Sequence, residues 1–270
     1  MSVRLVIDTR KTVEQNAAEH YERAKKAKRK ILGTERAIAK TREALAREAA
    51  AGAAAKDAIP KVATVRTPAR KREWFENFRW IVTSDGFLCV GGRDATTNET
   101  VVKKHAADTD LVFHTDAAGA PFIVLKTDGK EATDAAKEEA AEFAAAASRS
   151  WKTGVRTAEV FCARPEQLSK TPNSGESLGK GAFVVRGHVQ YYRPEMRFAI
   201  GKDAQGRVMG GPPSAVAAHC PERYAILQGA EKPSDVAKRL APLLGVSADE
   251  LIRALPPGEV KLGARSGSDR

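Results

Sequence analysis

A short polar stretch, GGRDATTNETVVKKH at residues 91–105, combines the residue types that loops use to bind phosphate or to catalyse reactions. Two glycines let a backbone approach a phosphate closely, and the guanidinium of Arg93 can grip one with two parallel hydrogen bonds. The spacing does not fit a P-loop, whose ending the stretch lacks, or a dinucleotide-binding loop, which needs three spaced glycines. The alternative is a turn between two regular elements, in which Arg93 pairs internally with Asp94 or Glu99.

A second polar stretch, LSKTPNSGESLGKGAFVVRG at residues 168–187, leads into an apolar run. Lysines, backbone amides and small hydroxyls are the groups that proteins direct at phosphodiester backbones. The stretch therefore indicates nucleic-acid contact, unless it is only a surface loop in front of a strand.

Histidine, cysteine and acidic residues could also support catalysis or metal binding. His114 lies two residues before Asp116, but a metal site there would need a third ligand from elsewhere in the chain. The three cysteines form no CxxC pair, and their odd number does not suit a disulfide framework. We therefore predict no catalytic residue, no metal site and no cofactor.

Positive charge is concentrated at one end of the chain. There are 45 Lys and Arg against 34 Asp and Glu, a formal net charge of +11, and the whole excess lies in residues 1–72. A segregated basic segment predicts a polyanionic partner, usually nucleic acid, although a lysine-rich helix kept for solubility has the same composition. The basic residues singled out in this arm are Lys25, Lys26, Lys28, Arg29, Lys30, Arg70, Lys71 and Arg72.

The hydrophobic content bears on the class of protein. At 42% it is sufficient for a packed core. No apolar run approaches the roughly 20 residues of a membrane helix, and the first residues lack the apolar stretch of a secretory signal. We therefore expect a soluble cytoplasmic protein with no membrane partner.

Residues 14–56 predict a helical arm. They contain no proline and are rich in Ala, Lys, Arg and Glu, which are strong helix formers. The arm, residues 1–56, is expected to be basic and coiled-coil-like, with a narrow apolar seam that could pair with a helical protein partner. Residues 57–73 contain two prolines and predict an extended linker. The seam consists of Ala17, Ala24, Ile31, Ile38 and Leu45.

From Trp74 onward, aromatic and β-branched residues surround turn signals. WFENFRWIVTSDGFLCVGG predicts two strands joined by a tight turn over residues 78–90. Further strands are expected at residues 111–114 and 122–126, and a helix follows that Thr133 caps and Gly154 ends. The predicted fold class is α+β, with a mixed or antiparallel sheet and flanking helices after the basic arm.

The folded part is expected to divide into a core over residues 74–201 and an extension over residues 202–270 that packs on it. The sequence of the extension predicts two helical segments, with Ser234 and Ser247 as their N-terminal caps. Met1 and a plausible tail favour a complete short protein.

Four ordered motifs between residues 78 and 201 carry a resemblance: FRWIVTSDGFLCVGGRDATTNETVVKKH, DLVFHTDAAGAPFIVLK, QLSKTPNSGESLGKGAFVVRG and RFAIG. Together they resemble the RNA-binding C-terminal half, NFACT-R, of the NFACT ribosome quality-control proteins. VIDTRKTVEQNAAEHYERAKKAKRKI is similar to the start of that family's coiled-coil arm. KPSDVAKRLAPLLG and ELIRALPPGEVKL resemble the tail of archaeal members.

The resemblance implies a role in translation. Full-length members bind large ribosomal subunits that carry a stalled nascent chain, recruit tRNA and extend that chain without a template. The family's NFACT-N and helix-hairpin-helix domains have no counterpart in this sequence, and Thr115 stands where the family usually has alanine. Binding to structured RNA is the family property that these departures affect least.

We therefore predict an NFACT-R-type protein that binds tRNA, the large ribosomal subunit, or both, in quality control of stalled nascent chains. One alternative is a factor in tRNA modification such as thiolation, with His105, His114, Asp116 or Cys162 near the reactive centre. Another is an interaction protein whose arm pairs with a second helix. The predicted RNA-binding residues are Arg93, Asn98, Lys103, Lys104, His105, His114, Lys170, Ser174, Lys180 and Arg186.

Overall fold

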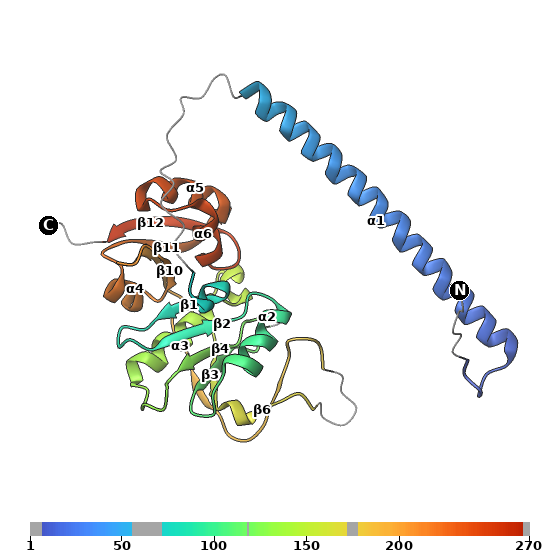
Figure 1. The fold of residues 1–270 in the computed structure, drawn as a ribbon. Coiled ribbons are helices and arrows are strands. Elements are labelled where there is room, and N and C mark those ends of the chain that lie inside the picture. Colours follow the sequence, from blue (N-terminus) through green and yellow to red (C-terminus); the bar gives the residue numbers. More distant parts are fainter. Residues whose placement is uncertain (1–6, 56–71, 118, 172–177, 267–270) are drawn as a thin grey trace. The chain divides into compact units, whose positions relative to one another are not determined.

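The computed structural model describes residues 7–55, 72–117, 119–171 and 178–266, with the backbone alone for residues 44–55. The chain falls into two units, an N-terminal arm and a folded unit that begins at residue 71. The α+β class is confirmed, because antiparallel sheets and helices combine in the folded unit and a helix precedes them in sequence (Figure 1). Outside the described residues lie most of the predicted linker and three predicted contact residues, Arg70, Lys71 and Ser174.

The arm is one helix, α1 (Val13–Ala55), which continues through Gly33 without a break (Figure 1). Thr12 and Gln15 begin it with a reciprocal cap: the Gln15 N–H donates to the Thr12 hydroxyl at 3.3 Å, and the Thr12 N–H donates to the Gln15 side chain at 3.0 Å. Ile31 and Ile38 of the predicted seam are exposed, as are the five arm cations from Lys25 to Lys30. The helical arm is confirmed, and its pairing with a partner helix stays a prediction. Across the described ranges, no helix has the length and apolar character needed to cross a lipid bilayer.

The folded unit is built on an antiparallel sheet of six strands in the order β1-β2-β4-β3-β5-β8. The predicted strand pair is confirmed, since Val82 pairs with Leu88 across a tight turn. The next two predicted strands are also present, the first over the predicted residues and the second starting one residue later. The strands are β1 (Arg79–Val82), β2 (Leu88–Gly91), β3 (Leu111–His114), β4 (Ile123–Lys126), β5 (Val160–Ala163) and β8 (Gln190–Tyr192).

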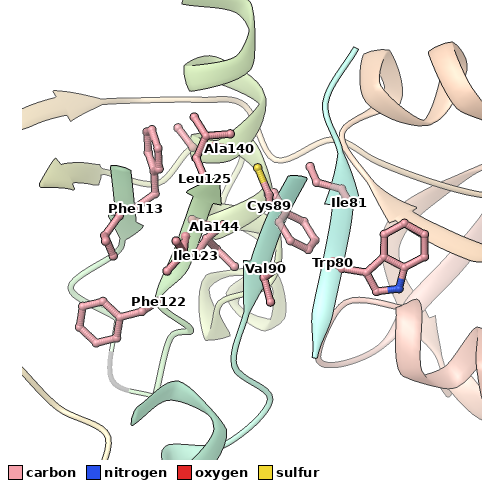
Figure 2. Close-up of a cluster of buried hydrophobic side chains, with 14 of the residues drawn as sticks. Trp80, Ile81, Cys89, Val90, Phe113, Phe122, Ile123, Leu125, Ala140 and Ala144 are labelled. Atoms are coloured by element: carbon pink, nitrogen blue, oxygen red, sulfur yellow. The ribbon is translucent and has the colours of Figure 1, made fainter. Parts of the chain in front are cut away.

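Helix α3 (Asp134–Ala146) packs against this sheet, and Figure 2 shows its Ala140 and Ala144 among the side chains of the strands. Thr133 caps the helix as predicted, because its hydroxyl accepts the N–H of Ala136 at 3.0 Å. The helix ends earlier than expected, since Ser148 caps a separate 3-10 turn over Arg149–Thr153 that Gly154 ends with a φ of 72°. Small alanine side chains let the helix approach closely and bury the face of the sheet beneath it.

A second antiparallel sheet, in the order β10-β9-β11-β12, occupies much of the region predicted as a helical extension. It joins segments far apart in sequence, for example Gln228 with Val260. Ser247 caps its helix as predicted, but Pro233 rather than Ser234 starts the preceding helix, because proline is already shaped for a first helical position. These elements are β9 (Phe198–Lys202), β10 (Val208–Gly211), α4 (Pro213–His219), β11 (Glu222–Glu231), α5 (Pro233–Leu244), α6 (Ala248–Ala254) and β12 (Val260–Ser266).

Most of the predicted RNA-binding residues belong to the segments that connect the strands of the first sheet. The first polar stretch contains a helix that is followed by a π-helical turn. In the second polar stretch, two short strands at residues 168–169 and 184–185 pair antiparallel. The short element before β1 is η1 (Trp74–Asn77). Those between the strands are α2 (Ala95–Thr100), η2 (Val101–His105), η3 (Arg149–Thr153), η4 (Pro165–Gln167), β6 (Leu168–Ser169) and β7 (Val184–Val185).

Candidate nucleic-acid interface

The GGRD stretch forms the tight link between β2 and α2. A Cβ atom on Gly92 would overlap the side-chain oxygen and backbone of Asn98, so the packing requires glycine there. Asp94 begins α2, since its carboxylate accepts the N–H of Thr97 at 2.8 Å. Glycine and aspartate therefore shape the loop, and any binding by this stretch depends on its other side chains.

Arg93 uses its guanidinium to hold three segments together. Its Nε donates to the carbonyl oxygen of Asn77 at 3.2 Å, Nη1 to that of Arg253 at 2.7 Å, and Nη2 to that of Phe78 at 2.7 Å. These bonds replace the internal pairing with an acidic neighbour that the sequence left open. Burial lowers the pKa of Arg93, and the nearby charge of Arg253 lowers it further, so its positive charge is poorly compensated.

Asn98 is buried, and both the nitrogen and the oxygen of its side-chain amide form hydrogen bonds within the protein. Its amide nitrogen donates to the carbonyl oxygen of Ala120 at 3.2 Å, and its amide oxygen accepts the N–H of Phe122 at 3.2 Å. The side chain therefore fixes α2 to the segment before β4, at the lining of the cavity described below.

Replacing Asn98 by alanine is expected to lower the free energy of unfolding by about 2–3 kcal/mol, because a buried carbonyl and a buried N–H lose their partners. Chemical denaturation of the purified variant measures this. Thr96→Ala, on the exposed side of the same helix, is the matched control and should change stability by less than about 0.5 kcal/mol. Equal stability of the two variants would contradict the structural role of Asn98.

Glu99 ties the first polar stretch to the second. Its carboxylate accepts the ammonium of Lys103 at 2.6 Å and that of Lys170 at 3.3 Å, and the backbone N–H of Gly181 at 3.4 Å. The bonds from Lys103 and then Lys170 lower the pKa of Glu99 to about 2, so it stays ionised at neutral pH. A phosphate near these two lysines would have to compete with this carboxylate.

Lys104 and His105 lie at the end of the π-helical turn. Lys104 is exposed, and the ring of His105 stacks on Trp74 with centroids 4.4 Å apart. Burial lowers the pKa of His105, and Lys126 and Lys104 lower it further. The neutral His105 and the half-exposed Trp74 form an aromatic surface beside a lysine.

The principal cluster of unpaired cations surrounds a cavity of about 480 Å³, called here the basic cavity. Asp94 is the acidic residue in its described lining. Within the described part of the chain, none of its five cations forms an ion pair: Arg79 and Arg93 donate to backbone carbonyls, and the charge of Lys180 contributes to lowering the pKa of Asp94. The five cations lining the basic cavity are Arg79, Arg93, Arg149, Lys152 and Lys180.

The electrostatics of the basic cavity favour an anion. Burial, and to a lesser extent the charge of Arg93, lower the pKa of Arg79 to about 10. Arg79 nevertheless stays charged at neutral pH, with the carbonyl oxygen of Leu255 as a hydrogen-bond acceptor at 3.0 Å. Neighbouring cations repel one another, and a bound phosphate would relieve that repulsion.

The structure therefore places the predicted contact residues at several different positions. Lys180 and Arg93 lie together at the basic cavity, and Lys104 is exposed on another element. Arg186 is exposed, with one donor bonded to the carbonyl oxygen of Thr171 at 3.3 Å. Sequence reasoning missed Arg79, Arg149 and Lys152, because they stand singly among apolar or small residues, outside the two polar stretches.

Cysteine chemistry finds no support in the folded unit. Burial raises the pKa of the Cys162 thiol to about 11 and that of Cys220 to about 12, and it also raises the pKa of Cys89. All three thiols are buried and stay protonated at neutral pH, whereas a reactive cysteine needs an accessible thiolate. Searched over the described ranges alone, the chain has no cluster of three or more His, Cys, Asp or Glu that could hold a metal ion.

Comparison with known proteins identifies the part of the chain that contains this site. Residues 77–187 match the family model described as the NFACT protein RNA binding domain. All five cations of the basic cavity lie within these residues.

Two curated relatives extend the match. The chain is 37% identical over 196 residues to the archaeal Rqc2 homolog aRqcH of Methanocaldococcus jannaschii, which covers 70% of this chain and 29% of the relative. It is 31% identical over 182 residues to the ribosome quality control complex subunit NEMF of Homo sapiens, covering 66% of this chain and 16% of that protein. The chain thus matches less than a third of either relative's length.

A solved structure is also similar over part of the chain. It is the C-terminal part of the fibronectin/fibrinogen-binding protein from Streptococcus suis, with 21% identity, 52% coverage of each chain and a TM-score of 0.37. A similarity at this level supports no inference here.

Proposed function

The chain belongs to the NFACT family, whose RNA-binding domain it carries at residues 77–187, and we propose that it binds RNA through the basic cavity and the exposed cations around it. The observation that carries the proposal is the gathering of five cations around one cavity with a single described acidic residue, Asp94. Arginine and lysine side chains in such a cavity are suited to phosphate oxygens.

The proposed RNA is tRNA, the rRNA of the large ribosomal subunit, or both. The human relative is named as a subunit of a ribosome quality control complex, and the archaeal relative as a homologue of a protein of that type. We propose that this chain works in the same process, on ribosomes with stalled nascent chains in the cytoplasm. RNA with a defined shape is the expected ligand, because phosphate contacts carry little information about base sequence.

The basic arm would provide a second positively charged surface for RNA. Its cations from Lys25 to Lys30 are exposed on α1, and they would add contacts to the RNA backbone that depend strongly on salt. A different role for the arm is suggested by Ile31, Leu32 and Ile38, which are about half exposed and could pack against a helix of a protein partner.

Binding of the whole chain and of residues 71–270 to tRNA and to large ribosomal subunits, measured across a salt series, tests the proposal. We expect both proteins to bind, with a steeper dependence on salt for the whole chain. Each phosphate contact contributes about 0.9 to the slope of log affinity against log salt concentration, so the difference in slope counts the contacts of the arm.

The outcomes separate the two elements. Binding that disappears with residues 1–70 would place recognition in the arm and contradict the role of the basic cavity. Equal affinities and slopes would leave the arm without RNA contacts and favour its pairing with a helical partner, which light scattering and pull-down experiments can detect. Failure of both proteins to bind either RNA would overturn the proposed function.

A further inference from the structure

A second cavity adjoins the basic cavity, and three aromatic rings line it together with His114, Asp116 and several small or aliphatic residues. It has a volume of about 500 Å³, within the range of about 300–1,000 Å³ that small-molecule sites occupy. Phe161, Phe183 and Tyr191 line it, and it is called here the aromatic cavity. The two cavities share His114 and Phe183 in their lining, so they meet along these side chains.

His114 presents a hydrogen-bond acceptor at this boundary. Its Nδ1 lies 2.9 Å from the carbonyl oxygen of Pro121, which can only accept, so Nδ1 carries the proton and Nε2 has a free lone pair. The ring stacks flat on Phe122, with centroids 3.8 Å apart and an angle of 4° between the planes. Burial lowers the pKa of His114, which keeps the imidazole neutral at pH 7.

Phe183 lines both cavities with His114 and packs against two neighbouring side chains. Its ring meets Phe122 edge to face at 5.3 Å, and the ammonium of Lys170 lies 4.3 Å from its centroid. The bond from Lys170 to Glu99 fixes that ammonium in turn. The predicted contact residue Lys170 therefore orients an aromatic side chain at the cavity.

Tyr191 completes the lining from β8, a strand at the edge of the sheet. It is 58% exposed, unlike its buried neighbour Tyr192, which packs in the core. Packing within the protein does not account for an exposed aromatic ring beside a cavity. Exposed aromatic rings are the surfaces on which RNA-binding proteins stack unpaired bases.

We propose that the two cavities together hold one unstacked nucleotide of the bound RNA, with its base in the aromatic cavity and its phosphate in the basic cavity. The inference rests on the proposed function and makes it more specific. Charge and polarity are complementary to the two halves of a nucleotide: Phe183 and Tyr191 face a base, while Arg149 and Lys180 lie where a phosphate would bind. His114 would accept a hydrogen bond from the nucleoside through Nε2.

The test compares the affinities of the whole chain for two RNAs of equal length, a blunt duplex and a hairpin with an unpaired loop. Wild-type protein is expected to prefer the hairpin. Tyr191→Ala should lower affinity for the hairpin about tenfold and leave affinity for the duplex unchanged, because loss of one stacked base affects only the unpaired RNA. Tyr191→Phe retains the ring and is the matched control, which should keep the preference. His114→Gln provides a second variant, expected to weaken binding to the hairpin alone.

Adenosine monophosphate serves as a competitor in the same experiment. It should displace the hairpin at a lower concentration than the duplex, because only the hairpin is expected to occupy both cavities. An unchanged ratio of hairpin to duplex affinity in Tyr191→Ala and His114→Gln would overturn this inference while leaving RNA binding intact. Absence of binding to either RNA would instead overturn the proposed function. If adenosine monophosphate still bound to such a protein, the cavities would be a site for a free nucleotide and not for RNA.

Discussion

Charge reversal at Arg149 and Lys180 together is expected to lower the affinity of the chain for tRNA by about 100-fold, or about 2.7 kcal/mol. Both side chains line the basic cavity and are exposed, and neither forms an ion pair with a described residue. Glutamate at these positions removes two phosphate contacts and adds repulsion. Titrations across a salt series should also show a slope reduced by about 2, because each phosphate contact contributes about 0.9.

The matched control reverses two exposed lysines on other elements, Lys238 of α5 and Lys261 of β12. It changes net charge by the same amount, so it measures the general effect of charge on binding. We expect a loss of less than fivefold for this control. A similar loss in both double variants would show that the basic cavity has no special role, and no loss in either would place the RNA elsewhere on the chain.

Asp110→Ala is expected to lower the free energy of unfolding of the folded unit by about 3–5 kcal/mol. The carboxylate is fully buried at the start of β3, where it accepts the ammonium of Lys126, the N–H of Ala107 at 2.8 Å and the N–H of Thr127 at 2.9 Å. Its removal leaves a largely buried cation and two backbone donors without their acceptor. Lys126 also donates to the carbonyl oxygen of His105 at 2.9 Å, so the π-helical turn should loosen as well.

Urea denaturation followed by circular dichroism measures the effect. Asp108→Ala is the control, because Asp108 lies two residues away and is exposed, and its loss should cost less than about 0.5 kcal/mol. The double variant with Lys126→Ala should lose less than the sum of the single variants, since the two residues share one interaction. A loss below about 1 kcal/mol for Asp110→Ala would show that water replaces the carboxylate.

Local signals in the sequence were sufficient for the early part of the fold. The turn residues between Val82 and Leu88 predicted a strand pair, because a tight turn determines which residues face each other. Thr133 and Ser247 predicted the helix starts they provide, because a cap acts within three residues of its own position. The pairing of β11 with β12 was not predictable in this way. The alternation of apolar and polar residues indicates a strand but does not indicate which other strand it pairs with.

Residue type was a weaker guide to the candidate site. Asn98, Lys103 and Lys170 were singled out for RNA contact, yet each of them is hydrogen-bonded within the protein, Lys103 to the nearby Glu99 and the other two to distant segments. Arg149 and Lys152 were not predicted as contact residues from the sequence, yet both line the basic cavity. The difference arises because a polar side chain is free or bonded according to neighbours that come from distant segments.

The sequence by itself was sufficient to predict the basic helical arm, the α+β class and the membership of an RNA-binding family. Composition, capping residues and ordered motifs are all read from residues that are close together in the sequence. Only the tertiary structure decided which cations remain unpaired and where they meet. The basic cavity brings together Arg79 of β1, Arg149 of η3 and Lys180 of the loop before β7. Their proximity results from packing between elements up to about 100 residues apart, which no local pattern encodes.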